Sequence, residues 1–410
     1  MPFETLKRST SRVLLLTLLV GTAARANPLS EFISSKIASN SEVLAASEVL
    51  KAAQANRDLA ASTLYPKISA NWNSTKSDTH EGFQNLLSLN AEQTLFGGGQ
   101  EYTELQAARL GVSKAEYDLA DAEDRAQARF ALKLAQIVLD KERGEVLDKT
   151  KHAQEDRLTE LKRRFRIGQS REPDLLQVEV ERSRLDRKIA DNVTAIEKDE
   201  QQIKSLLLLE DSEMQTLNTL INPQGVKLLY MSLAPRPEYR SASLKLSADA
   251  LAQKEKSAWL TATPTLGLYG QQNLIRPSSS TNAWEWGLKA QWTFFDGFKT
   301  PAQVETARSQ KVIAERALFA FDYDRKNNLV RLARESERSE AKKEAIDADI
   351  ANATKALKQQ EHDYRLRIVT EIEVQSTIQS ILDLELELLD IQATRAQLHL
   401  QKFLGGEQVL

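Results

Sequence analysis

The chain has 410 residues, of which 28% are charged and 41% hydrophobic, with a net charge of −3 and no cysteine. This composition is typical of a folded protein and argues against both a disordered chain and a bundle of membrane helices. The absence of cysteine excludes disulfides, thiolate metal sites, cysteine nucleophiles and a lipid-modified cysteine, so any membrane attachment must come from the fold itself.

Residues 1–26 have the pattern of a secretory signal peptide. Three basic residues precede an apolar stretch over 13–20, and a small-residue cleavage site ends at Ala26. The stretch is far shorter than the roughly 18 to 20 residues of a spanning helix, so we expect it to be cleaved. Because the removed segment contains four basic residues and one acidic residue, the mature chain has a net charge of −6. Export and negative charge together argue against a nucleic-acid partner.

An N-terminal helix is expected over 27–64, followed by a first β-hairpin over 65–99. In the second half of this hairpin, apolar and polar residues alternate, and a period of two predicts a strand. The apolar positions are Leu87, Leu89, Ala91 and Leu95. The expected partner strand contains Ile68, Ala70 and Trp72, and a polar loop over 73–85 joins the two strands.

A long helical hairpin is expected over 100–210. Helix-favouring residues continue to Arg166, residues 167–170 interrupt them, and Pro173 is placed for the first turn of a return helix. A helix of about 65 residues is roughly 100 Å long, at 1.5 Å per residue. Apolar residues in the return helix repeat every seven positions, which predicts a coiled-coil seam. These residues are Ile189, Ile196 and Ile203.

After a linker over 211–236 and a helix over 237–263, a second β-hairpin is expected over 264–297. Apolar residues alternate with polar ones through 284–294, a longer and clearer strand pattern than the first. The apolar positions are Trp284, Trp286, Leu288, Ala290, Trp292 and Phe294. Alternation over roughly 9 to 11 residues with aromatic residues near the ends is what a transmembrane barrel strand requires. The alternative for one such hairpin is a soluble hairpin packed on helices.

A second long helical hairpin is expected over 298–404, ahead of a tail over 405–410. Its last helix carries apolar residues at spacings of 3, 4, 3 and 7, another coiled-coil seam. They are Ile381, Leu384, Leu388, Ile391 and Leu398. An offset of 199 relates the two halves of the chain, for example Leu89 to Leu288 and Phe96 to Phe295, which indicates an internal duplication.

The two predicted β-hairpins give four strands per chain, too few to close a barrel. An open sheet edge leaves backbone groups unsatisfied in lipid, so several copies must contribute strands to one barrel. The predicted fold is therefore mainly α with a membrane β-barrel part. The alternative is a non-channel periplasmic coiled-coil adaptor or scaffold, which explains the heptads but not the barrel strands.

Motifs in both halves resemble the TolC-type outer-membrane efflux protein family over essentially the whole mature chain. In the first half they are Leu64-Tyr65-Pro66-Lys67-Ile68, Thr94-Leu95-Phe96-Gly97-Gly98-Gly99, and the tip Arg164-Phe165-Arg166-Ile167-Gly168-Gln169-Ser170. Between the halves lies Arg236-Pro237-Glu238. The second half has Ala262-Thr263-Pro264-Thr265-Leu266 and Thr293-Phe294-Phe295-Asp296-Gly297.

The resemblance implies a homotrimer with a 12-stranded β-barrel in the outer membrane of a Gram-negative bacterium, on an α-helical barrel that extends into the periplasm. It implies passive export of drugs, toxic ions or secreted polypeptides, driven by an inner-membrane pump through a periplasmic adaptor. No enzymatic activity and no cofactor are expected. The aromatic residues expected to contact outer-membrane lipid are Trp72, Trp284, Trp286 and Trp292.

The resemblance also assigns roles at the two helical tips. Ile167, Gly168 and Gln169 fall where relatives dock the adaptor, and Asp174 and Tyr364 fall where relatives hold the tip closed. Glu373 falls on an acidic ring at the entrance, where three copies of one carboxylate would attract cations. For both carboxylates, the alternative is a helix-start residue favoured by the helix dipole.

The second tip departs from this pattern, because Arg367 stands where the first tip has Gly168, so we expect that turn to be built differently. The basic run over 162–166 is interpreted as a solvated helix face, with contact to an adaptor as the alternative. The four histidines are scattered without ligand spacing, so no metal site is predicted.

Overall fold

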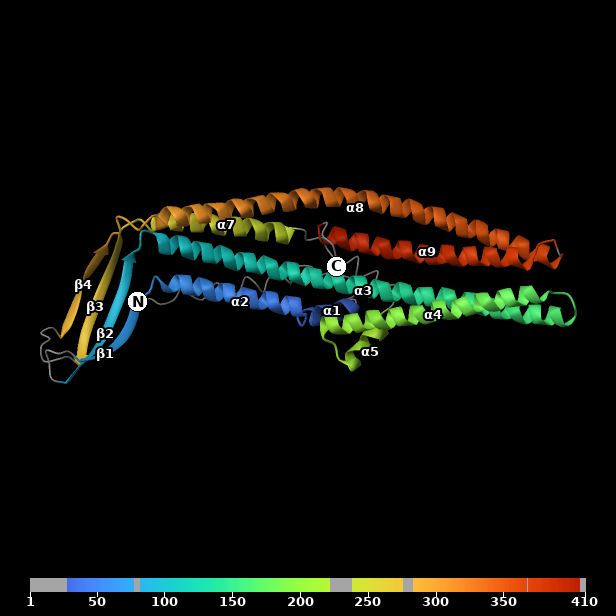
Figure 1. The fold of residues 1–410 in the computed structure, drawn as a ribbon, viewed down its shortest axis with the longest axis horizontal. Helices are drawn as coiled ribbons and strands as arrows, with labels where there is room; N and C mark the ends of the chain where they lie inside the picture. Colours follow the sequence, from blue (N-terminus) through green and yellow to red (C-terminus); the bar gives the residue numbers. More distant parts are fainter. Residues whose placement is uncertain (1–27, 77–81, 222–237, 276–282, 367, 406–410) are drawn as a thin grey trace.

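The computed structural model describes residues 28–76, 82–221, 238–275, 283–366 and 368–405, so the expected signal peptide lies outside it. These residues form a long rod of helices with a four-stranded sheet at one end (Figure 1). Among them, no helix combines the length and apolarity needed to cross a bilayer.

The sheet contains β1 (Lys67–Lys76), β2 (Phe83–Phe96), β3 (Thr265–Ile275) and β4 (Trp284–Gln291), in that order and antiparallel throughout. β2 pairs with β3, so the two expected hairpins form one sheet. Residues paired across strands share a face. One row across the sheet is Ile68, Ala91, Gly270 and Trp286, and the next is Ser69, Asn90, Gln271 and Glu285. The sheet therefore has an apolar face and a polar face.

The strand ends differ from those expected. β1 and β2 extend through Asn73 paired with Leu86 to Lys76 paired with Phe83, so much of the expected loop over 73–85 is strand. β4 ends at Gln291, although alternation predicted strand to 294. Gln291 pairs with Thr265, the first residue of β3. Pro264, the residue before Thr265, has no N–H to donate to a longer β4, so the pairing stops there.

The duplication reappears in the helices. α3 (Gln100–Arg166) and α8 (Lys299–Arg365) both have 67 residues and begin 199 positions apart. The shorter helices α4 (Glu172–Leu207) and α9 (Glu371–Phe403) also begin 199 positions apart. At about 1.5 Å per residue, α3 and α8 are each roughly 100 Å long. Towards the sheet, α2 (Ser41–Ser62) and α7 (Glu238–Leu260) accompany them, and α4 and α9 accompany them towards the tip (Figure 1).

The expected helix over 27–64 is divided into α1 (Pro28–Ile37) and α2. Asn40 ends the first and caps the second, because its side-chain oxygen accepts hydrogen bonds from the Glu42 and Val43 N–H groups. Its side-chain amide donates to the Leu206 carbonyl at 2.8 Å, which fixes the break against α4.

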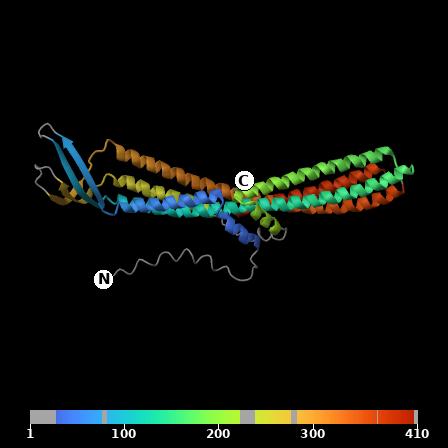
Figure 2. The ribbon, with the colours of Figure 1, turned by 90° about the horizontal axis from the view of Figure 1, so that it is seen from below.

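The main hydrophobic core lies at the middle of the rod, where α1 and α5 (Asp211–Leu220) pack near the meeting of the other helices (Figure 2). Its largest fully buried side chains include Leu29, Ile33, Phe130, Leu134, Ile137, Ile203 and Leu217. The rest of the expected linker over 211–236 lies almost wholly outside the described residues. The main core thus lies at the centre of the rod, with the sheet at one end and the helical tip at the other.

Candidate functional site

The first helical turn at the tip is closed by a glycine. Gly168 has φ 72°, in the left-handed region that glycine adopts without strain. Its N–H donates to the Phe165 carbonyl at 2.9 Å, and the Gln169 N–H donates to the Arg164 carbonyl at 2.8 Å. This pair of bonds is the Schellman motif that ends many helices. It leaves Ile167 exposed at the end of the rod.

Asp174 begins the return helix α4. Its carboxylate accepts a hydrogen bond from the Arg171 N–H at 3.3 Å, the reciprocal half of a capping box. Its negative charge also contributes to raising the pKa of Tyr364 on the other hairpin. Asp174 therefore has a helix-start role and lies within electrostatic reach of Tyr364.

The second turn has the same closing bond as the first. The Ile368 N–H donates to the Asp363 carbonyl at 2.9 Å, 199 positions after the bond from Gln169 to Arg164. Arg367, which stands where the first turn has Gly168, lies outside the described residues, so the expectation of a differently built turn stays a prediction. Glu373 is exposed near the start of α9, where its N–H donates to the Thr370 hydroxyl oxygen at 3.4 Å and that hydroxyl donates to its carboxylate at 3.2 Å.

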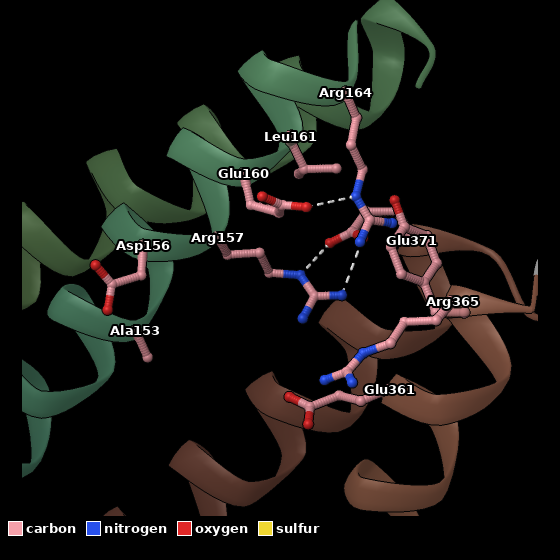
Figure 3. Close-up of a pocket in the computed structure, with 10 residues that line it drawn as sticks. Ala153, Asp156, Arg157, Glu160, Leu161, Arg164, Glu361, Arg365 and Glu371 are labelled. Atoms are coloured by element: carbon pink, nitrogen blue, oxygen red, sulfur yellow. Dashed lines mark hydrogen bonds and ion pairs between the residues drawn. The ribbon is translucent and has the colours of Figure 1, made fainter. Parts of the chain in front are cut away.

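A polar cavity of about 260 Å³ lies just behind the tip, between α3 and the pair α8 and α9 (Figure 3). Three arginines, four carboxylates and one tyrosine dominate its lining. They are Asp156, Arg157, Glu160, Arg164, Glu361, Tyr364, Arg365 and Glu371.

The central contact of this cavity is an ion pair between the two repeats. Arg157 on α3 donates from Nη2 to Oε2 of Glu371 at 2.9 Å and from Nε to Oε1 at 2.5 Å. The Glu371 side chain is 0% exposed and that of Arg157 is 16% exposed. Glu371 also accepts from the Gln375 amide, whose oxygen accepts from Gln154 on α3. This two-bond geometry is the strong form of a charge-assisted hydrogen bond.

Two guanidinium groups lie over the Tyr364 ring. The Arg157 and Arg164 carbons lie 5.5 Å and 5.4 Å from its ring centre, within cation–π range. Burial raises the pKa of its phenol and the Glu371 charge adds to this, so the hydroxyl keeps its proton at neutral pH. Glu160 accepts a hydrogen bond from Arg164 at 2.8 Å, and bonds from Arg163 and Arg164 lower the Glu160 pKa.

Of the three predicted gating residues, the cavity lining includes Tyr364, while Asp174 and Glu373 lie at the helix starts beyond it. Sequence reasoning missed Arg157 and Glu371. The sequence signal on α3 was the pair of polar residues at 154 and 157, which stand next to Leu158 and Leu161 in an otherwise apolar seam. The matching residue of the first repeat is also a glutamate, Glu172, but it is exposed. The two copies thus have different surroundings, and the duplication alone did not mark Glu371 as buried.

The predicted membrane-facing aromatics lie at the opposite end of the molecule. By strand parity, Trp72, Trp284 and Trp286 share the apolar face of the sheet, and all three are exposed. Trp292 lies beyond the end of β4, where its indole N–H donates to the Ala262 carbonyl at 3.1 Å.

The chain is similar in structure to several solved outer-membrane proteins. VceC from Vibrio cholerae matches with a TM-score of 0.80 at 16% identity, over 92% of this chain and 96% of VceC. The outer-membrane channel OprN matches with a TM-score of 0.78 at 16% identity, over 93% of this chain and 91% of OprN. The CmeC outer membrane channel of Campylobacter jejuni matches with a TM-score of 0.77 at 14% identity, over 93% of this chain and 86% of CmeC.

No protein-family model and no curated protein sequence matches the chain. The likeness to the solved structures therefore concerns the fold, and it covers nearly the whole of each chain. The protomer fold expected from the resemblance to TolC-type proteins, mainly helical with a small antiparallel sheet, is confirmed: the chain has the fold of outer-membrane channel proteins.

Proposed function

We propose that this chain is one protomer of a homotrimeric channel in the outer membrane of a Gram-negative bacterium, through which solutes leave the periplasm passively. The observation that carries the proposal is the single-layer sheet, apolar on one face and polar on the other, at the end of a long helical rod. Trp286 on the apolar face is 68% exposed and Ile68 is 71% exposed, so the protomer alone leaves this face uncovered.

Lipid is the environment that suits such a sheet. β3 has 11 residues, about 37 Å at 3.4 Å per residue, and at a tilt near 45° it would cross an apolar band of roughly 25 Å. Three copies would supply twelve strands and close the edges at β1 and β4, which satisfies their backbone groups. The apolar face with Trp72, Trp284 and Trp286 would contact lipid, Trp292 would lie at its border, and the polar face would line the pore.

The rods of three copies would form an α-helical barrel across the periplasm. A stripe along α8 supports this, because exposed apolar side chains recur at spacings of 7, 4 and 7 as in a coiled-coil seam. They are Val312, Phe319, Tyr323 and Val330. A soluble adaptor or scaffold would also use such a stripe, but it would leave the apolar face of the sheet in water. The channel accounts for both surfaces.

The helical tip would be the periplasmic entrance. Its exposed first turn, Ile167, Gly168 and Gln169, would dock a periplasmic adaptor that links the channel to an inner-membrane pump, the source of energy. Exposed Glu373 would form a ring of three carboxylates at the entrance, and Asp174 and Tyr364 would help to hold the tip closed. The exported solute could be a drug, a toxic ion or a secreted polypeptide.

Conductance tests this function with a matched pair of variants. Ala70 and Asn71 are neighbours on β1 and lie on opposite faces of the sheet. Reconstituted in a planar lipid bilayer, the protein should form stable conducting channels. Asn71→Trp, on the pore side, should reduce the unitary conductance, and Ala70→Trp, on the lipid side, should leave it unchanged. A protein that purifies as a soluble monomer and never conducts would contradict the proposal.

A further inference from the structure

A strained phenylalanine stands at the junction between the sheet and the rod. Phe298, the residue before α8, has φ 65° and ψ 17°, in the left-handed region. For a bulky L residue this conformation crowds Cβ against the backbone and is unfavourable. Among the described residues, the other non-glycine residue with positive φ is Leu208.

The first repeat shows what this position requires. Gly99, 199 positions earlier, precedes α3 with φ 86° and ψ 2°. The turn from sheet to helix therefore needs a left-handed residue in both repeats, and glycine meets the need without strain. Compared with glycine at this position, phenylalanine makes the backbone conformation less favourable and contributes only its side chain. That side chain is 72% exposed and contacts the Phe295 ring edge-on at 5.4 Å between centres, so packing within the protomer does not explain it.

The surroundings continue the apolar face of the sheet. Trp292 and Phe294 follow Leu288 and Ala290 with the same alternation, and their rings lie 4.4 Å apart. Phe294 and Phe295 are both strongly exposed. The Trp292 indole has an apolar ring, and its N–H is hydrogen-bonded. Tryptophan side chains are enriched at membrane–water interfaces. Two ring pairs, Trp292 with Phe294 and Phe295 with Phe298, thus form an exposed aromatic patch in the chain between the end of β4 and the start of α8.

We propose that Phe298, together with Phe295, inserts into lipid at the periplasmic boundary of the barrel and anchors the channel there. The inference rests on the proposed function, because it assumes that the apolar face of the sheet contacts lipid. The occupant is the boundary between lipid headgroups and acyl chains, which receives exposed aromatic rings at the ends of membrane barrels. The chain has no cysteine to carry a lipid, so its hold on the membrane depends on side chains such as these.

Site-directed spin labelling tests the anchor directly, since the absence of cysteine allows single labels without a background. Phe298→Cys and, as a second probe of the same patch, Phe295→Cys are labelled with a nitroxide in the full chain and reconstituted in vesicles of phosphatidylethanolamine and phosphatidylglycerol. Leu288→Cys, on the apolar face, is the lipid reference, and Asp324→Cys, an exposed polar position further along α8 and outside its apolar stripe, is the reference outside the bilayer. Collision rates with oxygen, which enters lipid, and with a water-soluble nickel chelate give the depth of each label.

The label at 298 should have an oxygen-to-nickel collision ratio several-fold higher than the label at 324. A ratio at 298 and 295 equal to that at 324 would overturn the anchor while leaving the channel intact, provided the label at 288 reports lipid. Low collision rates with both reagents would overturn it too, because they would mean that a neighbouring copy covers the patch. A label at 288 in water would refute the proposed function itself and the anchor with it.

Discussion

The Arg157–Glu371 ion pair should stabilise the packing of α9 against α3 behind the tip, and Glu371→Gln tests this with a calculable effect. The substitution removes the charge but keeps the shape, so it leaves the Arg157 guanidinium largely buried without its counter-ion. Removing one partner of a buried ion pair costs about 3 to 5 kcal/mol. We expect the lower end, roughly 3 kcal/mol, because the Tyr364 ring 5.5 Å away continues to stabilise the cation.

Hydrogen exchange of the full channel in detergent measures this effect locally. A loss of about 3 kcal/mol corresponds to roughly 100-fold faster exchange for amides that exchange by opening of the first turns of α9. Glu335→Gln is the control, because it removes an exposed ion pair with Arg331 worth about 0.5 kcal/mol or less.

A double-mutant cycle completes the test. If the pair is the stabilising unit, Arg157→Met combined with Glu371→Gln should cost less than the sum of the two single substitutions. Additive effects, or unchanged exchange in Glu371→Gln, would refute the reasoning and would mean that contacts elsewhere hold α9 against α3.

Three further predictions follow from the described contacts. Gly168→Ala should lower the local stability of the first tip turn by about 1 kcal/mol, because alanine is strained at positive φ; exchange at the end of α3 measures it. Trp286→Arg should cost roughly 2 to 4 kcal/mol of barrel stability in vesicles, whereas Gln271→Arg on the polar face should cost much less, as measured by urea titration. Hydrogen bonds from the Thr300 hydroxyl and N–H lower the Asp296 pKa below its unfolded value. The ionised Asp296 carboxylate therefore stabilises the start of α8 above the pKa that Asp296 has in the unfolded chain, and this stabilisation is lost as the pH falls through its pKa in the folded protein. In Asp296→Asn, hydrogen exchange at the start of α8 should no longer become faster on acidification.

Much of the architecture could be predicted because its signals are periodic. Alternation at 284–291 and heptads in the last helix reflect which residues share one face of a strand or helix, and the sequence records this directly. The end of β4 and the break at Asn40 depended on partners elsewhere in the chain, Pro264 ahead of β3 and the Leu206 carbonyl of α4.

The candidate site was harder to predict for the same reason. Ile167, Gly168 and Gln169 could be placed because a local motif ends the helix. The Arg157–Glu371 pair joins residues 214 positions apart, from different repeats, and requires the packing of α3 against α9. Neither heptads nor the duplication specifies which polar residues of two seams meet.

Disulfide trapping between subunits tests the central claim most directly. Within one chain, β1 and β4 are separated by two strands, about 14 Å, too far for a disulfide. Asn71→Cys is therefore combined in turn with Glu285→Cys, Gly287→Cys and Lys289→Cys and oxidised in membranes. If three copies share one barrel, at least one combination gives a covalent species of three times the protomer mass. If no combination cross-links and all the protein remains a protomer, the shared barrel is contradicted.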